Sequence, residues 1–260
     1  MSLPDERKYA VLGTTPIRTD GYEKVTGAAR YTADMSLPGM LYAAGLSAGI
    51  PNGRIISMDT EEAKKMPGVA AVVIAEDLPK MISASSHPFL ANRPRCAGDL
   101  VAIVAAETKE AAEAAISHIH VEYEEYPAVM TIKEALAEGA PQVRDEYPGN
   151  VFSDTHYQIR LGNGEEAFKK CDVILEREYE TQIVEHAYIE PEAVMAYTNP
   201  SDGLMTVHCP SQAPYYTRRY VAEILGIPVA RVRVVQETIG GTFGGKEDGL
   251  GMMAARCAYL

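Results

Sequence analysis

The residues whose types and spacing most clearly suggest binding chemistry form a glycine-rich run, Gly240-Gly-Thr-Phe-Gly-Gly-Lys-Glu247. Glycine permits positive φ angles and lets a ligand approach the main chain closely, and amides at the start of a helix point toward a bound group. The run fits the phosphate-loop pattern G-x-x-x-x-G-K, which next requires Ser or Thr to hold magnesium. Glu247 stands there instead, and its carboxylate would repel phosphates. We therefore expect a ligand other than a nucleoside triphosphate, and a turn needed only for packing is the alternative.

Other polar side chains are weaker candidates for chemistry. His186 and Glu190 are four residues apart, as zinc ligands on a helix would be, but Pro191 and its strand-like neighbours argue against a helix there. His118 and His120 have no metal-binding signature around them and are interpreted as surface or packing residues. No role is assigned to His118 and His120. His186 and Glu190 are interpreted as parts of a strand whose histidine and acidic side chains fix neighbouring main chain, and a direct catalytic part is the alternative.

A strand and a helix must position the glycine-rich run. Residues 231–235 alternate like a half-buried strand, and residues 250–260 are apolar enough for a buried helix, so the glycines form a strand-to-helix turn. Upstream, another strand starts at Leu204 and runs into a second helix. Ser211 is a good N-cap for that helix, and Gly226 is a typical signal for its end.

The first half of the chain has the pattern of a compact α+β domain. Asp59 and Glu62 predict a capping box for a helix through Lys65, and Thr108 is the predicted N-cap of a helix over residues 109–118. Short apolar or alternating runs predict the strands between these helices. The predicted strands cover residues 39–46, 54–58, 69–75, 100–106 and 120–124.

Proline, glycine and polar residues between residues 126 and 153 mark a domain junction, which we place near residue 145. The predicted division is an N-terminal extension over residues 1–17, the α+β domain over 18–145 and a second domain over 146–260.

The second domain is predicted to open with a short helix over residues 164–170 and a long strand over 173–182. In that strand a row of three glutamates shares one face, and period-2 alternation makes this the solvated face rather than a cation site. Residues 185–194 predict a further strand. The three glutamates are Glu176, Glu178 and Glu180.

Composition excludes several classes of function. The net charge of −12, from 24 basic and 36 acidic residues, argues against a nucleic-acid partner because little would neutralise phosphates. We find no apolar run of membrane-spanning length and no apolar core of a signal peptide, so we expect a cytoplasmic protein. The four cysteines are scattered without zinc or iron–sulfur spacing.

The glycine-rich run resembles the G-G-x-F-G-G-K-E loop of the xanthine dehydrogenase and aldehyde oxidase family of molybdenum hydroxylases. Residues 18–34 resemble the family's R-x-D-x-x-x-K-V-T-G-x-A-x-Y-x-x-D opening, and residues 185–191 its E-H-x-x-L-E-P stretch, with Ile189 in place of leucine. Residues 49–54 depart from the family's small-His segment. The resemblance implies an α+β fold in which a hammerhead-like α/β domain precedes the incomplete first molybdopterin-binding domain.

The resemblance also implies roles for particular residues. In the family, the glutamine at the position of Gln212 donates a hydrogen bond to an oxygen ligand of molybdenum, and an amide suits this task because it adds no charge. The main chain of Gly241, Thr242, Phe243 and Gly244 is implied to contact the pterin, with Phe243 also close to the oxygen ligands of the metal.

Glu247 is the implied substrate contact. Members of the family that hydroxylate purines place a carboxylate there to hydrogen-bond the heterocycle, whereas relatives that oxidise aldehydes often carry another residue. The alternative for Glu247 is a structural ion pair with Lys246 or Arg256.

The implied reaction is hydroxylation of a purine or related N-heterocycle, or alternatively of an aldehyde, with water as the oxygen source and a glutamate as general base. The family's base lies in a downstream G-x-G-E motif, and this chain ends at Leu260. We therefore expect no activity from the chain alone and a partner that supplies the C-terminal remainder of the molybdenum subunit. The implied cofactor is molybdenum–molybdopterin, with or without a cytosine dinucleotide, while iron–sulfur clusters and FAD belong to partner subunits.

Two hypotheses stay open. The chain is either part of a split active site or a non-catalytic assembly module that keeps half of the cofactor surface. In both cases the C-terminal helix and the face with Gln212 and the glycine-rich run lack a covering layer, and the apolar surface exposed there favours an oligomer.

Overall fold

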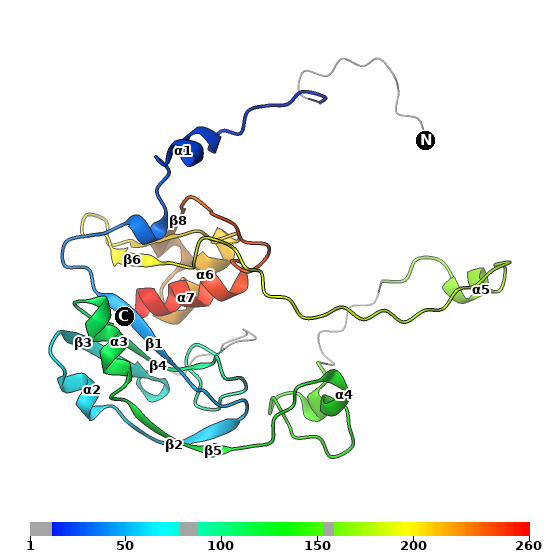
Figure 1. Ribbon diagram of the computed structural model, residues 1–260, viewed down its shortest axis with the longest axis horizontal. Coiled ribbons are helices and arrows are strands. Elements are labelled where there is room, and N and C mark those ends of the chain that lie inside the picture. Colours follow the sequence, from blue (N-terminus) through cyan, green and yellow to red (C-terminus); the bar gives the residue numbers. More distant parts are fainter. Residues whose placement is uncertain (1–11, 79–87, 153–158) are drawn as a thin grey trace.

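The structure is a computed structural model that describes residues 12–78, 88–152 and 159–260. The strands of these residues form three small sheets, with helices packed against two of them (Figure 1). The mixture of helices and sheets confirms the predicted α+β class.

Strand β4 (Leu100–Ala106) is the centre of the first sheet. It pairs antiparallel with β1 (Tyr42–Ser47) along one edge and with β3 (Val69–Ile74) along the other. All of its residues after the first are buried, because it has neighbours on both edges and apolar layers on both faces.

Alternate residues of β4 enter different hydrophobic cores. Ala102 and Val104 pack with helices α2 (Glu61–Lys65) and α3 (Lys109–Ile116), whereas Ile103 packs with residues of the C-terminal half. The first sheet therefore lies between its own helices and the C-terminal unit. This shared core attaches the two halves of the chain to each other.

The second sheet is an antiparallel pair of β2 (Gly53–Asp59) and β5 (His120–Glu125). The third sheet contains β6 (Met195–Thr198), β7 (Met205–Cys209) and β8 (Val232–Gln236) in that order. Strands β7 and β8 run parallel because helix α6 (Pro214–Leu225) connects them.

Helix α7 (Asp248–Tyr259) follows β8 and packs against α6 (Figure 1). Leu250 is fully buried in the core that these two helices share with β7 and β8. Near the other end of α7, the Arg256 guanidinium donates hydrogen bonds to the main-chain oxygens of Phe89 and Pro88, at 2.7 and 2.9 Å. These contacts fix α7 and hence the turn that precedes it.

The remaining helices are short. They include α1 (Gly21–Thr26), α4 (Ile132–Ala135) and α5 (Gly164–Phe168), and 3-10 turns occur at Thr32–Asp34, Ala75–Asp77, Pro148–Asn150 and Val229–Arg231.

The predicted cap at Thr108 is confirmed, since its hydroxyl accepts a hydrogen bond from the Ala111 amide. The predicted capping box of α2 is wrong. Thr60 is the N-cap and makes no side-chain cap bond, while Asp59 accepts a hydrogen bond from the Glu61 amide at 3.0 Å. The Asp59 carboxylate is short enough to bond locally, and it closes a turn rather than the helix.

The long strand predicted over residues 173–182 does not form. The strand predicted over 185–194 does not form either, and the next strand, β6, begins only after it. A strand needs hydrogen-bonded neighbours for its main chain, and no strand in the described part of the chain pairs with this segment. The three glutamates are exposed as expected, but the face opposite them is exposed too, with Leu175 at 77% and Tyr179 at 87%.

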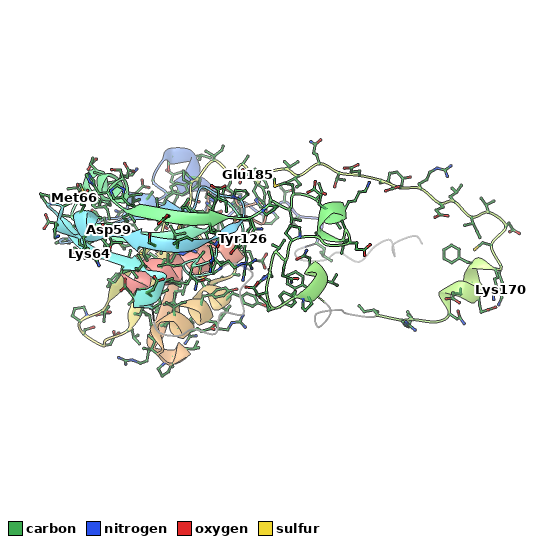
Figure 2. All side chains as sticks on the ribbon, turned by 90° about the horizontal axis from the view of Figure 1, so that it is seen from below. Asp59, Lys64, Met66, Tyr126, Lys170 and Glu185 are labelled. Carbon is green, nitrogen blue, oxygen red and sulfur yellow. The ribbon has the colours of Figure 1, made fainter. Side chains whose placement is uncertain are left out.

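Residues 159–185, which we call the arm, project from the rest of the molecule. Figure 2 shows Lys170 at the outer end of the arm and Glu185 where the arm returns to the body. The apolar side chains of the arm are uncovered, and Leu161 and Ile183 are essentially fully exposed.

None of the helices within the described ranges combines the length and the apolar character that crossing a membrane requires.

Replacement of Leu250 by alanine tests the core that fixes α7. Removing a fully buried side chain should lower the free energy of unfolding by about 2–5 kcal/mol. Leu136→Ala is the control, because Leu136 is 59% exposed, and it should change stability by no more than about 0.5 kcal/mol. Urea denaturation followed by circular dichroism measures both. Equal losses for the two variants would show that α7 does not depend on this core.

Candidate functional site

The glycine-rich run connects the end of β8 to the start of α7, as predicted. Gly241 and Gly244 have φ angles of 110° and 100°, which residues with side chains rarely adopt. Phe243 lies between them with φ of 49°, in the left-handed region, and its side chain is 76% exposed. The loop therefore turns its main chain and one unpacked aromatic ring outward.

Gly240 and Gly245 are needed for close packing instead. A Cβ at Gly245 would lie 2.6 Å from Cε1 of Tyr188, and a Cβ at Gly240 would lie 2.6 Å from Cβ of Glu190. Both distances are far shorter than normal carbon–carbon contacts of about 3.5–4.0 Å. The packing interpretation is thus correct for these two glycines. The conformations of Gly241 and Gly244 shape the segment between them and Lys246, and we call residues 240–246 the outer loop.

Two lysines bind the loop to other segments. Lys246 is fully buried, and its Nζ lies 2.8 Å from Oε2 of Glu190. Lys24, on α1, donates a hydrogen bond to the main-chain oxygen of Ile239 at 2.9 Å. Sequence analysis missed both contacts, because residues far apart in the chain form them.

Gln212 lies beside the loop. Its main-chain amide donates a hydrogen bond to the main-chain oxygen of Lys246 at 2.9 Å, and its side chain is exposed. The predicted N-cap, Ser211, lies two residues too early, because Ala213 is the N-cap of α6. The Ser211 hydroxyl is buried, accepts a hydrogen bond from the Ala213 amide and also contacts the Thr217 hydroxyl. Ser211 thereby fixes the turn from which Gln212 extends.

The outer loop offers unused hydrogen-bond donors. Among the described residues, no acceptor bonds to the main-chain amides of Gly241, Thr242, Phe243 and Gly244. Successive amides of this kind in a loop that precedes a helix favour an anionic or oxygen-rich group. We call the residues with these unbonded main-chain amides, together with Gln212 and its exposed side-chain amide, the donor face.

Glu247 is exposed at the start of α7 and makes no side-chain cap bond. The structural ion pair considered for it is wrong. Lys246 is bound to Glu190, and Arg256 is bound to the main chain of residues 88–89. The carboxylate of Glu247, directly after the loop in sequence, is therefore exposed and free to bind a ligand.

Tyr188 and His186 pack against the loop at Gly245. Sequence analysis expected His186 to fix neighbouring main chain and did not single out Tyr188. The Tyr188 ring lies 4.6 Å from Nζ of Lys246, and its hydroxyl donates a hydrogen bond to Glu192 at 2.9 Å. Burial raises the pKa of Tyr188 to about 12, and the hydrogen bond to the Glu192 carboxylate adds to the rise. The tyrosine is thus a neutral platform for the ammonium group at ordinary pH.

The donor face fits a molybdenum–pterin group that brings the metal with its own ligands. Within the described ranges, no cluster of three or more His, Cys, Asp and Glu side chains has the arrangement of a metal site. His118 and His120 lie on the surface near Glu62, at 3.3 and 3.9 Å. The donors at the loop are amides, which suit oxygen atoms and a pterin rather than direct metal ligation.

One G-x-G-E quartet does occur in this chain, at Gly162-Asn-Gly-Glu165, and our sequence analysis overlooked it. The structure places Glu165 in the first turn of α5, near the outer end of the arm and exposed to solvent (Figure 1). The loop is on the body of the molecule. Glu165 is therefore no candidate for a base acting at the donor face.

Gly245→Ala tests the close approach beneath the loop. The added methyl group must displace Tyr188, so the free energy of unfolding should fall by about 1–3 kcal/mol. Gly249→Ala is the matched control, since a Cβ there would meet no atom within 4 Å and alanine favours the helix by about 0.5–1 kcal/mol. Guanidinium denaturation of the two variants should give changes of opposite sign. A neutral Gly245→Ala would refute the packing account.

Comparison with known proteins agrees with this geometry. The model of the aldehyde oxidase and xanthine dehydrogenase a/b hammerhead domain matches residues 26–127, and the model of the molybdopterin cofactor-binding domain matches residues 143–260. The solved structures that are similar include quinoline 2-oxidoreductase from Pseudomonas putida 86, with a TM-score of 0.78, 28% identity and coverage of 95% of this chain and 33% of that one. The aldehyde oxidoreductase of Desulfovibrio gigas gives a TM-score of 0.76, 26% identity and coverage of 93% and 29%.

Among curated proteins, the nicotinate dehydrogenase large molybdopterin subunit of Eubacterium barkeri is 36% identical over 93% of this chain and 57% of its own length. A probable xanthine dehydrogenase subunit of Bacillus subtilis is 38% identical over 89% of this chain and 31% of its own. The chain thus spans between about a third and somewhat over half of these relatives. With both family models matched in order along it, the chain belongs to the aldehyde oxidase and xanthine dehydrogenase family and carries the hammerhead and molybdopterin-binding domains of its molybdenum-binding subunits.

Proposed function

We propose that this chain forms part of the active site of a molybdenum hydroxylase that acts on a purine or a related N-heterocycle. The observation that carries the proposal is the hydrogen bond from the Gln212 amide to the Lys246 oxygen, at 2.9 Å. This bond attaches the residue that carries the exposed Gln212 side chain to the end of the loop whose amides are unbonded. One set of donors can then contact both the pterin and the oxygen ligands of the metal.

Each part of the donor face has a separate task in this proposal. The main-chain amides of Gly241 to Gly244 bind the cofactor, with Phe243 nearest to the metal, and the Gln212 amide orients an oxygen ligand. When bound, the molybdenum–pterin group supplies the two-electron redox chemistry of hydroxylation with water. In this proposal the hydrogen-bond donors are already in position before the cofactor binds, so they need not reorganise during the reaction.

Glu247 supports an N-heterocycle as the substrate class. A carboxylate accepts hydrogen bonds from ring N–H groups, and this one has no competing cation within the described residues. Relatives named for nicotinate, quinoline and xanthine are consistent with the same class. An aldehyde is the alternative substrate, because the chain is also similar to an aldehyde oxidoreductase. The experiments below therefore include an aldehyde.

The general base is proposed to come from another polypeptide segment, the counterpart of the remaining length of the relatives. Glu165 is remote and Glu247 is assigned to substrate binding, so neither is proposed as the base. Iron–sulfur and FAD subunits are the proposed electron acceptors. If the chain carries no cofactor even beside such a partner, it is an assembly module instead.

Gln212→Ala tests the cofactor contact. In a co-expressed assembly with a polypeptide that supplies the remainder of the molybdenum subunit, the variant should bind less molybdenum or release it on gel filtration, because one donor is lost. The chain alone should contain no molybdenum and should turn over neither xanthine nor benzaldehyde. Gln182→Ala on the exposed arm is the control, and elemental analysis is the measurement. Undiminished metal with full activity in Gln212→Ala would contradict the assignment.

Glu247→Gln tests the substrate contact separately. Loss of a charged acceptor should lower kcat/KM for xanthine or nicotinate by about 10- to 100-fold, while molybdenum content and kcat/KM for benzaldehyde stay unchanged. Glu223→Gln, on the exposed side of α6, should leave all three values unchanged. A uniform fall for every substrate would mean that Glu247 does not select heterocycles.

A further inference from the structure

Lys246 is the largest fully buried side chain of the described residues, and it carries a charge. Removal of an ammonium group from water is unfavourable, and a buried ion pair is often no more stabilising than apolar residues of the same size. The presence of this lysine therefore needs an explanation other than stability. Its contacts supply one.

Nζ of Lys246 donates hydrogen bonds to two atoms of Glu190, the main-chain oxygen and Oε2, each at 2.8 Å. The same Oε2 accepts the main-chain amide of Gly240 at 2.6 Å. Gly240 and Lys246 are the two ends of the outer loop. One carboxylate oxygen therefore binds both ends of the segment that presents the unbonded amides.

The other oxygen, Oε1 of Glu190, is buried and has no hydrogen-bond partner among the described residues. A buried acceptor without a donor reduces stability. If burial were the only requirement at this position, an apolar residue would serve better. The arrangement of Glu190 is instead suited to geometry, because a single oxygen is shared by the two loop ends.

We infer that Glu190 and Lys246 are a positioning pair that holds the two ends of loop 240–246 together and so sets the direction of its free amides. The effect on the loop stands on the contacts alone. Its consequence for cofactor binding rests on the proposed function. Neither residue is proposed to touch substrate or the reacting atoms.

The test compares Glu190→Gln, Lys246→Met and the double variant, in which both side chains keep nearly their original size. Lys246→Met alone leaves a buried carboxylate unpaired, so its Tm should fall. The double variant removes both charges, and its Tm should return close to that of the wild type. If the pair had a purely structural role, the double variant would then match the wild type in every other property as well.

Loop position is read from amide hydrogen exchange by NMR at Gln212 and Gly245. Their acceptors are main-chain oxygens of Lys246 and Thr242, which the substitutions do not remove. In the double variant we expect exchange at these two amides to be at least tenfold faster, while amides of β4 exchange as in the wild type. Glu61→Gln with Lys65→Met, at an exposed ion pair of 3.5 Å, is the control and should change neither Tm nor exchange.

Molybdenum content of the co-expressed assembly is the second readout, and it should fall in the double variant. Wild-type exchange at Gln212 and Gly245 in the double variant would overturn the inference, as would faster exchange spread evenly over β4 and the loop. If even the wild-type assembly lacks molybdenum while the loop amides still exchange faster in the double variant, the proposed function fails and the positioning pair stands.

Discussion

One buried contact, that between Glu190 and Lys246, joins the two ends of the glycine loop. A loop with two glycines at positive φ has many accessible conformations, and fixing one of them is entropically unfavourable. The contact restricts the loop from both ends, and the Gln212 amide attaches it to the start of α6. Its amides are therefore held in place without a ligand, so a ligand need not order them when it binds.

The two halves of the chain share the core that supports this loop. Strand β4 contributes Ile103 to the same hydrophobic cluster as Leu250 of α7, and Lys24 near the N-terminus contacts Ile239 just before the outer loop. The hammerhead domain is consequently more than a neighbour of the cofactor-binding domain. It packs against the helix that follows the loop, and α1, which ends where the residues matched as hammerhead domain begin, reaches the start of the loop.

Much of the local structure could be predicted from the sequence because it depends on near neighbours. The strand-to-helix turn at Gly240, the cap at Thr108 and the buried strand β4 all follow from patterns within a few residues. The long strand predicted over 173–182 was wrong for the opposite reason. Its alternation is that of a strand, but strand formation depends on a partner, and the described chain offers none.

The candidate site shows the same limit. Family resemblance led to Gln212, the loop and Glu247, and the structure brings Gln212 and the loop together through one main-chain hydrogen bond. Sequence analysis expected Glu190 to fix neighbouring main chain. It did not identify Lys246 as the partner, because 56 residues separate the two. It also left open an ion pair of Glu247 with Lys246 or Arg256. Both cations are bound to other partners that are distant in sequence.

The central claim is that the free amides of residues 241–244 bind the cofactor. The most direct test is to measure hydrogen exchange at these four amides in the co-expressed assembly, with the cofactor present and after its removal. The account predicts that exchange at these amides is markedly slower with the cofactor bound, while the exposed arm is unchanged in both states. Equal exchange rates at residues 241–244 in the two states would contradict it.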